Sequence, residues 1–181
     1  MSLDPAQSRK ILDKLLAMAK KAAPGADVTV QVGARHGGNT RFARGQVTSS
    51  ADVETRSVEI EIALGLRHAG AVTNQTDDAS LAALADRAAR LARLAPEDPE
   101  QLPPLGAQKY VPARAAYDAA TDTMSPLLRA QAAGAAMAAG KAKQLDVAGF
   151  YEHAGSSQAR ANSAGQFGHH RFTAASFTCT A

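Results

Sequence analysis

The chain has 181 residues, of which 45% are apolar and only 4% aromatic, and its net charge is +3. This length suits one good-sized domain or two small ones, with a core of aliphatic and alanine side chains. Residues 106–181 carry 7 basic and 4 acidic side chains, whereas residues 1–105 carry 13 of each. An excess so small and scattered argues against nucleic-acid binding, which normally needs a clustered basic face.

The single cysteine, Cys179, excludes a disulfide within the chain and favours a reducing compartment. Because no base or cation lies next to it in the sequence, we expect it to be a small buried hydrophobe. The N-terminus leads directly into a charged helical pattern without a signal peptide. The longest run of low polarity, residues 130–140, is too short to span a bilayer. We therefore expect a cytoplasmic protein that does not enter a membrane.

In chain order, the first half predicts a helix, a series of strands and a second helix. The predicted helices cover residues 4–23 and 79–94, and the predicted strands cover 28–32, 41–43, 46–50, 58–66 and 71–74. Ile11, Leu12, Leu15, Leu16 and Ala19 form the apolar stripe of the first helix, and Leu81, Leu84, Ala85, Ala88, Leu91 and Ala92 that of the second. The lysines and arginines of these helices fall mostly outside the stripes, so we interpret them as solvated faces.

The strongest strand signal is the stretch from Val58 to Leu66. Five apolar residues alternate with Glu59, Glu61, Ala63 and Gly65, and successive side chains of a strand point to opposite faces. Turns are expected around it at Gly37-Gly38, at Arg44-Gly45 and at 68–70, where glycine permits unusual backbone angles. The core is therefore predicted to be an antiparallel meander.

The second half repeats this order of elements. After a proline-rich linker at 99–124, we predict a helix over 126–144 and strands over 146–153, 159–162 and 171–180. Both halves place a glycine followed by glutamine in the hairpin, which suggests a duplicated helix–strand–hairpin–strand unit. The predicted fold is α+β, with a first unit at 1–98, the linker at 99–124 and a second, incomplete unit at 125–181. Because the chain stops inside a strand, we expect it to be the front portion of something longer.

Chemically reactive motifs are sparse. The histidines are His36, His68, His153, His169 and His170. The paired His169 and His170 point to opposite faces of a strand, and Glu152-His153 lacks the second histidine of a metalloprotease motif. Ser163 lies in the sequence ANSAG, which is typical of a turn rather than of a nucleophile elbow. We therefore predict no catalytic, cofactor-binding or metal-binding residue in this chain. Were zinc nevertheless to bind, His153, His169 and Cys179 would be the first ligands to test.

Two stretches resemble a known family. The first stretch is similar to the first domain of TldD/PmbA proteins, which are zinc-dependent proteases also called modulators of DNA gyrase; it comprises RFARGQVTSS and SVEIEIALGLRHAGAVTNQ. The second stretch resembles the second segment of that family and reads AGFYEHAGSSQARANSAGQFGHHRFTAASFTCTA. The resemblance covers residues 28–181, and the alanine- and arginine-rich composition agrees with a bacterial source.

The resemblance implies a role without a metal site. The family's histidine-glutamate pair, followed after three residues by a second histidine, matches no position here, so zinc is expected in a C-terminal part of the family. The chain would then be an N-terminal scaffold that walls the path of a peptide or unfolded substrate, inactive alone and associated with itself or a family member. The alternative is a stand-alone, non-enzymatic protein-binding or regulatory module.

Overall fold

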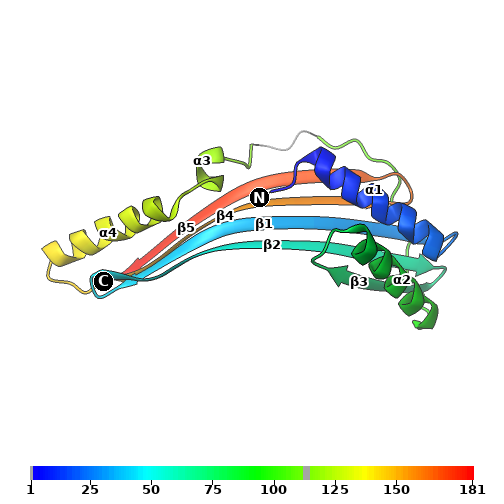
Figure 1. The fold of residues 1–181 in the computed structure, drawn as a ribbon, viewed down its shortest axis with the longest axis horizontal. Helices are drawn as coiled ribbons and strands as arrows, with labels where there is room; N and C mark the ends of the chain where they lie inside the picture. Colours follow the sequence, from blue (N-terminus) through cyan, green and yellow to red (C-terminus); the bar gives the residue numbers. More distant parts are fainter. Residues whose placement is uncertain (1, 112–114) are drawn as a thin grey trace.

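One antiparallel sheet of five strands, in the order β3-β2-β1-β4-β5, runs the length of the molecule (Figure 1). The computed structural model describes residues 2–111 and 115–181. The strands are β1 (Asp27–Ala43), β2 (Gln46–Leu64), β3 (Arg67–Thr73), β4 (Ala148–Asn162) and β5 (Phe167–Thr180). The helices are α1 (Pro5–Ala22), α2 (Asp78–Leu94), the short α3 (Ala119–Asp122) and α4 (Pro126–Ala142). The predicted α+β fold with long helices on an antiparallel sheet is confirmed.

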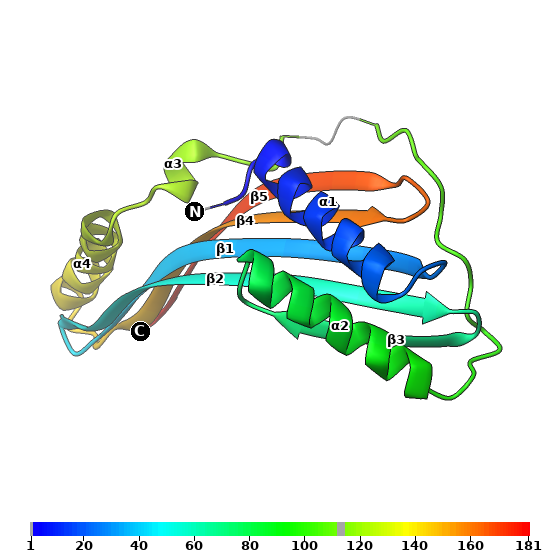
Figure 2. The same ribbon diagram turned by 45° about the vertical axis from the view of Figure 1, so that its right-hand side comes forward.

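The helices lie on one face of the sheet and gather at its two ends. Figure 2 shows α1 and α2 side by side over one end and α4 over the other, with α3 between them. Alternate residues of β1 from Val28 to Phe42 face these helices, and the residues between them face the opposite side. An antiparallel sheet can leave one face to solvent in this way.

The main core lies beneath α1 and α2. The alternating residues Val58, Ile60 and Ile62 pair across the sheet with Val32, Val30 and Val28, and all six are buried. Leu12 and Leu15 of α1, with Leu81 and Leu84 of α2, cover them. Full burial stabilises such a side chain by roughly 1.5–3 kcal/mol before chain entropy is subtracted. The predicted stripes of both helices are confirmed, except that Leu91 is 44% exposed because it lies at the border of the contact.

Of the three turns predicted in the first half of the chain, one is correct and two are wrong. Arg44 and Gly45 form the β1–β2 turn with positive φ angles of 50° and 74°. The β2–β3 turn lies at Gly65, with φ of 62°, and not at 68–70, so Leu66 is outside the strand and exposed. Gly37-Gly38 is no turn but the middle of β1, and the short strands predicted around it merge into long ones.

The two halves of the chain are arranged as the predicted duplication requires. The helices α1 and α4 each begin with a capping side chain followed by proline, at Asp4-Pro5 and Ser125-Pro126. Each helix precedes a hairpin with a positive-φ glycine, Gly45 or Gly165, followed by glutamine. Equivalent positions are thus about 120 residues apart, and β1 pairs antiparallel with β4. This pairing gives the halves an approximate twofold relation near His36 and Gly155, which face each other in the register.

Strands from both predicted units share this one sheet. Residues 29–43 of β1, from the first predicted unit, pair with residues 148–162 of β4, from the second, so a continuous ladder of hydrogen bonds joins the two units. The described linker residues are mostly irregular, α3 excepted, and residues 112–114 lie outside the described part of the chain. No helix in the described part has the length and apolar character needed to cross a membrane. The predicted cytoplasmic location stays a prediction.

Candidate functional site

The centre of the helix-bearing face holds charged side chains where a core would be apolar. Arg129 of α4 is fully buried, and its Nη2 donates to Oδ1 of Asp52 on β2 at 2.6 Å. Its Nε donates to the Thr40 hydroxyl of β1 at 3.3 Å, and Nη1 lies 3.4 Å from Nδ1 of His153 on β4. Nη1 also donates to the carbonyl of Met124. This Arg129 cluster therefore ties α4 to three strands at once.

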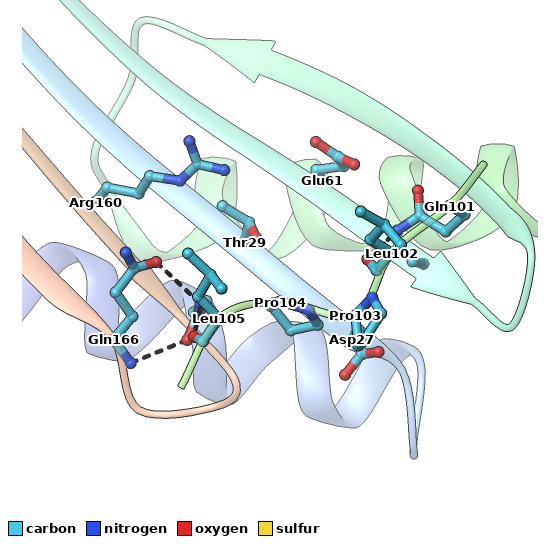
Figure 3. A pocket seen from close by; sticks show the side chains of 12 residues that line it. Asp27, Thr29, Glu61, Gln101, Leu102, Pro103, Pro104, Leu105, Arg160 and Gln166 are labelled. Carbon is cyan, nitrogen blue, oxygen red and sulfur yellow. Dashed lines mark hydrogen bonds between the residues drawn. The ribbon is translucent and has the colours of Figure 1, made fainter. Parts of the chain in front are cut away.

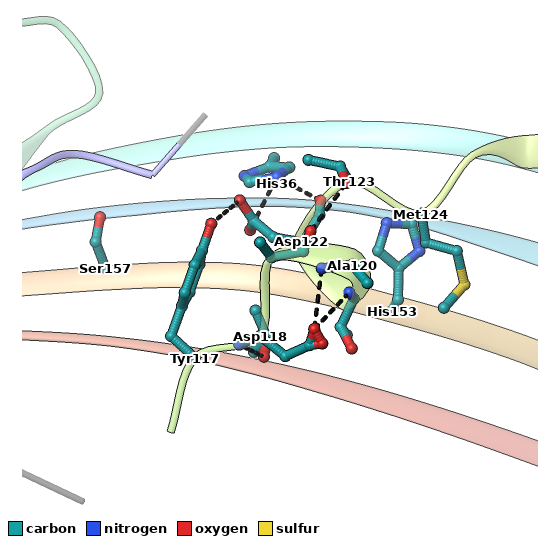
Figure 4. A network of polar contacts seen from close by, with 12 residues as sticks. His36, Tyr117, Asp118, Ala120, Asp122, Thr123, Met124, His153 and Ser157 are labelled. Carbon is teal, nitrogen blue, oxygen red and sulfur yellow. Dashed lines mark hydrogen bonds and ion pairs between the residues drawn. The ribbon is translucent and has the colours of Figure 1, made fainter. Parts of the chain in front are cut away.

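A second cluster, formed by His36, Tyr117 and Asp122, lies beneath α3 (Figure 4). The Tyr117 hydroxyl donates to Oδ2 of Asp122 at 2.8 Å. The ring atom Nε2 of His36 lies 3.1 Å from the backbone oxygen of Asp122 and 3.2 Å from its Oδ1. The guanidinium of Arg171 stacks on the Tyr117 ring, 3.5 Å from its centroid. This Asp122 cluster holds α3 against β1 and β5.

Two glycines make room for these clusters. A Cβ on Gly38 would meet the Arg129 guanidinium and the Asp52 carboxylate, and a Cβ on Gly155 would meet the carboxylate of Asp122. Glycine inside a strand usually costs stability, and its presence often marks a close approach by another group. Glycine is therefore required at position 38 because the Arg129 cluster occupies the space that a Cβ would fill. Gly37-Gly38 was wrongly interpreted as a turn because this distant contact is not visible in the local sequence.

Burial and the neighbouring charges set the protonation of the clusters. Desolvation, followed by the nearby Arg129 charge, lowers the pKa of His153 below its ordinary value. The hydrogen bond to Asp122 raises the pKa of Tyr117. At neutral pH, His153 therefore accepts a hydrogen bond from Arg129 instead of carrying a charge.

The Asp122 cluster does not have the geometry of a hydrolytic triad. The atom Nδ1 of His36 is buried and has no hydrogen-bond partner among the described residues. The nearby Ser157 hydroxyl accepts from the backbone N–H of Leu3 at 2.8 Å, so it anchors the N-terminal segment. A nucleophile bonded to a histidine base, which acyl transfer requires, is not found in the described clusters. Their contacts suit holding helices in place.

On the opposite face, residues 101–110, here named the strap, cross one end of the sheet. An open groove of about 500 Å³ lies beside the strap. Figure 3 shows Arg160, Glu61 and Asp27 on its sheet side. The buried Asn162 holds the strap, because its Nδ2 donates to the Leu105 carbonyl at 2.8 Å. Its Oδ1 accepts from the backbone of Gln166 at 3.0 Å. The groove is lined by charges of both signs, from Arg160, Asp27 and Glu61, which suits a contact surface.

The structure separates the three residues named as first zinc ligands to test. His153 pairs with Ala175 of β5. His169 and Cys179 therefore lie six and four residues away along that strand, about 20 and 13 Å at roughly 3.3 Å per residue. The described residues contain no group of three or more histidine, cysteine or acidic side chains placed to hold a metal. The predicted absence of a metal site stays a prediction.

Other predicted residues have structural contacts. Cys179 is exposed, which corrects the expectation of burial, because it lies at the end of an edge strand that α4 does not cover. Ser163 is in a turn, as predicted, and bonds the start of β1 through Val28. His68 lies between Glu61 and Asp98, at 3.5 and 3.1 Å. His169 lies 3.0 Å from the Leu3 carbonyl.

Sequence reasoning missed the residues that form both clusters, apart from their histidines. Arg129 is the single charged residue in the first fourteen positions of an alanine-rich helix, from Pro126 to Ala139, and was not singled out. Its side-chain partners come from 24 to 89 positions away in the sequence. The sequence signal for the clusters was weak, because Gly38 and Gly155, which make room for them, lie inside β1 and β4 only in the structure.

The fold is similar to those of several solved proteins. The structure of TldE from Thermococcus kodakarensis superposes with a TM-score of 0.82 at 13% identity, covering 91% of this chain and 37% of that one. A protein from Bacteroides thetaiotaomicron, described as a candidate modulator of DNA gyrase, gives 0.84 at 15% identity, covering 94% and 40%. A similarly described protein from Thermotoga maritima gives 0.75 at 17% identity, covering 93% and 38%.

These similarities confirm the resemblance to TldD/PmbA proteins at the level of the fold. The chain spans about two fifths of the length of the three structures. No family model matches the sequence, and a search of curated proteins finds no significant match.

Proposed function

We propose that the chain is the N-terminal scaffold region of a TldD/PmbA-type metalloprotease. The observation that carries this proposal is the fold shared over more than nine tenths of this chain with TldE and with two gyrase-modulator structures. The chain accounts for less than half of each of those proteins, which supports a role as one region of a larger assembly. The motif order in residues 28–181 supports the same family.

The exposed surfaces of the sheet suit a scaffold. The described helices leave one sheet face uncovered, and β3 pairs only with residues 58–64 of β2, so the outer edge of residues 46–57 has no neighbouring strand in the sheet. The outer side of β5 forms the other edge of the sheet, where Thr173 bonds Ala116 and Asp118. Unpaired strand edges recruit other chains. These surfaces would pack against a catalytic domain or partner subunit and wall the path of an extended peptide.

The chemistry of the proposed enzyme would then come from outside this chain. A catalytic zinc lowers the pKa of its bound water and polarises the scissile carbonyl, and it normally has three protein ligands and one open position. Peptides or unfolded proteins are the proposed substrates, and modulation of DNA gyrase is the family role that the names of two similar structures carry. The proposed partner is a second copy or a family member.

Complex formation with a metal-bearing TldD/PmbA-type subunit from the same genome tests the proposal. We expect one stable complex by size-exclusion chromatography with light scattering, and peptidase activity that is altered by the added chain. The alternative, a stand-alone binding or regulatory module, is favoured by the well-packed core beneath α1 and α2, which is formed within this chain. If the chain does not bind the family subunit but binds an unrelated protein without added metal, that result would support the alternative. The same result would overturn the proposal that the chain is a scaffold region.

A further inference from the structure

The helix α4 is attached to the sheet mainly by polar contacts. The apolar cluster beneath it has three buried members, Phe42, Ala133 and Val147, whereas the core under α1 and α2 has twenty. Leu127 and Leu128 in its first turn are 66% and 54% exposed. With so little apolar area buried, the Arg129 cluster supplies much of what holds this helix down.

One contact of the Arg129 cluster exists only with a neutral histidine. Nη1 of Arg129 always carries its protons, so the 3.4 Å contact to Nδ1 of His153 is a hydrogen bond only when that nitrogen is unprotonated. The charged groups that face His153 are Arg129 from α4, Asp52 from β2 and His36 from β1. Protonation would place a second cation beside Arg129, with Asp52 left to compensate both. Acid therefore weakens the attachment of α4.

The Asp122 cluster holds α3 through contacts that involve neither Arg129 nor His153. Nε2 of His36 lies 3.1 Å from the backbone oxygen of Asp122 and 3.2 Å from its Oδ1, and the Tyr117 hydroxyl donates to Oδ2. Loss of the contact between Arg129 and His153 therefore leaves α3 attached to the sheet.

We propose that acid releases α4 from the sheet, because protonation of His153 removes one of its polar contacts while the Asp122 cluster keeps α3 docked. The released helix stays tethered at both ends, by residues 123–125 to α3 and by residues 143–147 to β4. Release removes Arg129 from its site above Gly38 and uncovers Phe42 on β1. This inference rests on the two clusters and is independent of the proposed function.

Hydrogen exchange measured by mass spectrometry on the full chain tests the proposal, with rates corrected for the intrinsic effect of pH. Because protonation is linked to opening, the opening constant of residues 126–142 should rise by up to about tenfold per pH unit below roughly pH 6.5. Protection of α1 and α2 should not follow this dependence. Unchanged protection of α4 between pH 8 and pH 5 would overturn the proposal.

Single substitutions separate the roles of the histidines. His153→Gln keeps an acceptor for Arg129 but cannot titrate, so the acid response of α4 should be lost whatever the absolute stability of the variant. His36→Gln should keep the acid response of α4, because His36 contacts Asp122 and not Arg129. His170→Gln is the control, because His170 is exposed and stacks on Phe172 away from both clusters. A His153→Gln chain that retains the full acid response of α4 would overturn the assignment.

Discussion

Removing either partner of the Arg129–Asp52 ion pair breaks the same 2.6 Å contact but should cost different amounts. In Asp52→Ala, the fully buried guanidinium loses its carboxylate, and an uncompensated buried charge costs about 3–5 kcal/mol. In Arg129→Met, the Asp52 side chain, which is 61% exposed, is hydrated at little cost. The Thr40 hydroxyl keeps its contact with Ser50 at 3.2 Å, so it is not left without a partner. The remaining acceptors, on Met124 and His153, each lose a donor, at a cost of about 1 kcal/mol each.

Urea unfolding of the single and double variants measures this asymmetry. We expect Asp52→Ala to be at least about 1 kcal/mol more destabilising than Arg129→Met, by the difference between those costs. The double variant should match Arg129→Met alone, because the stranded charge is then absent. Additive losses, or a larger loss for Arg129→Met than for Asp52→Ala, would refute the reasoning that burial of the guanidinium dominates.

Three further predictions concern other parts of the chain. Gly155→Ala should lower the stability of the chain by about 1–3 kcal/mol in thermal unfolding, because the new Cβ would meet the carboxylate of Asp122. The control is Gly134→Ala, whose Cβ meets nothing within 4 Å and which should be neutral or stabilising by up to about 1 kcal/mol. Asn162→Ala should speed proteolytic cleavage within the strap by releasing it, and an unchanged cleavage rate would show that other contacts hold it. Ala175→Pro should weaken self-association by removing an outward-pointing donor from β5, since the Thr173 amide two residues earlier points away from β4 to Ala116. Light scattering that shows a monomer both with and without this substitution would reject pairing through that strand.

The sequence predicted what local patterns determine. Three predicted features depend only on neighbouring residues, and each is present in the structure. They are the capped helix beginning at Pro5, the alternation from Val58 to Ile62 and the Arg44-Gly45 hairpin. The β4–β5 hairpin around Gly165 was found for the same reason.

The features that local patterns could not predict depend on contacts between distant segments of the chain. Gly37 and Gly38 signal a turn locally, yet they lie inside β1 because Arg129 occupies the space above Gly38. The burial of Arg129 itself depends on Asp52, 77 positions away. The exposure of Cys179 follows from the place of β5 at the edge of the sheet, which periodicity does not reveal.

The most direct test of the scaffold proposal is the zinc content and peptidase activity of the purified 181-residue chain, measured together. After equilibration with zinc and removal of the excess, elemental analysis should find no stoichiometric metal, and an unfolded peptide should remain uncleaved. The physical reason is that His153, His169 and Cys179 are spread along two strands and cannot converge on one ion. One tightly bound zinc per chain, with cleavage that a chelator abolishes, would contradict the account and place the catalytic site in this chain.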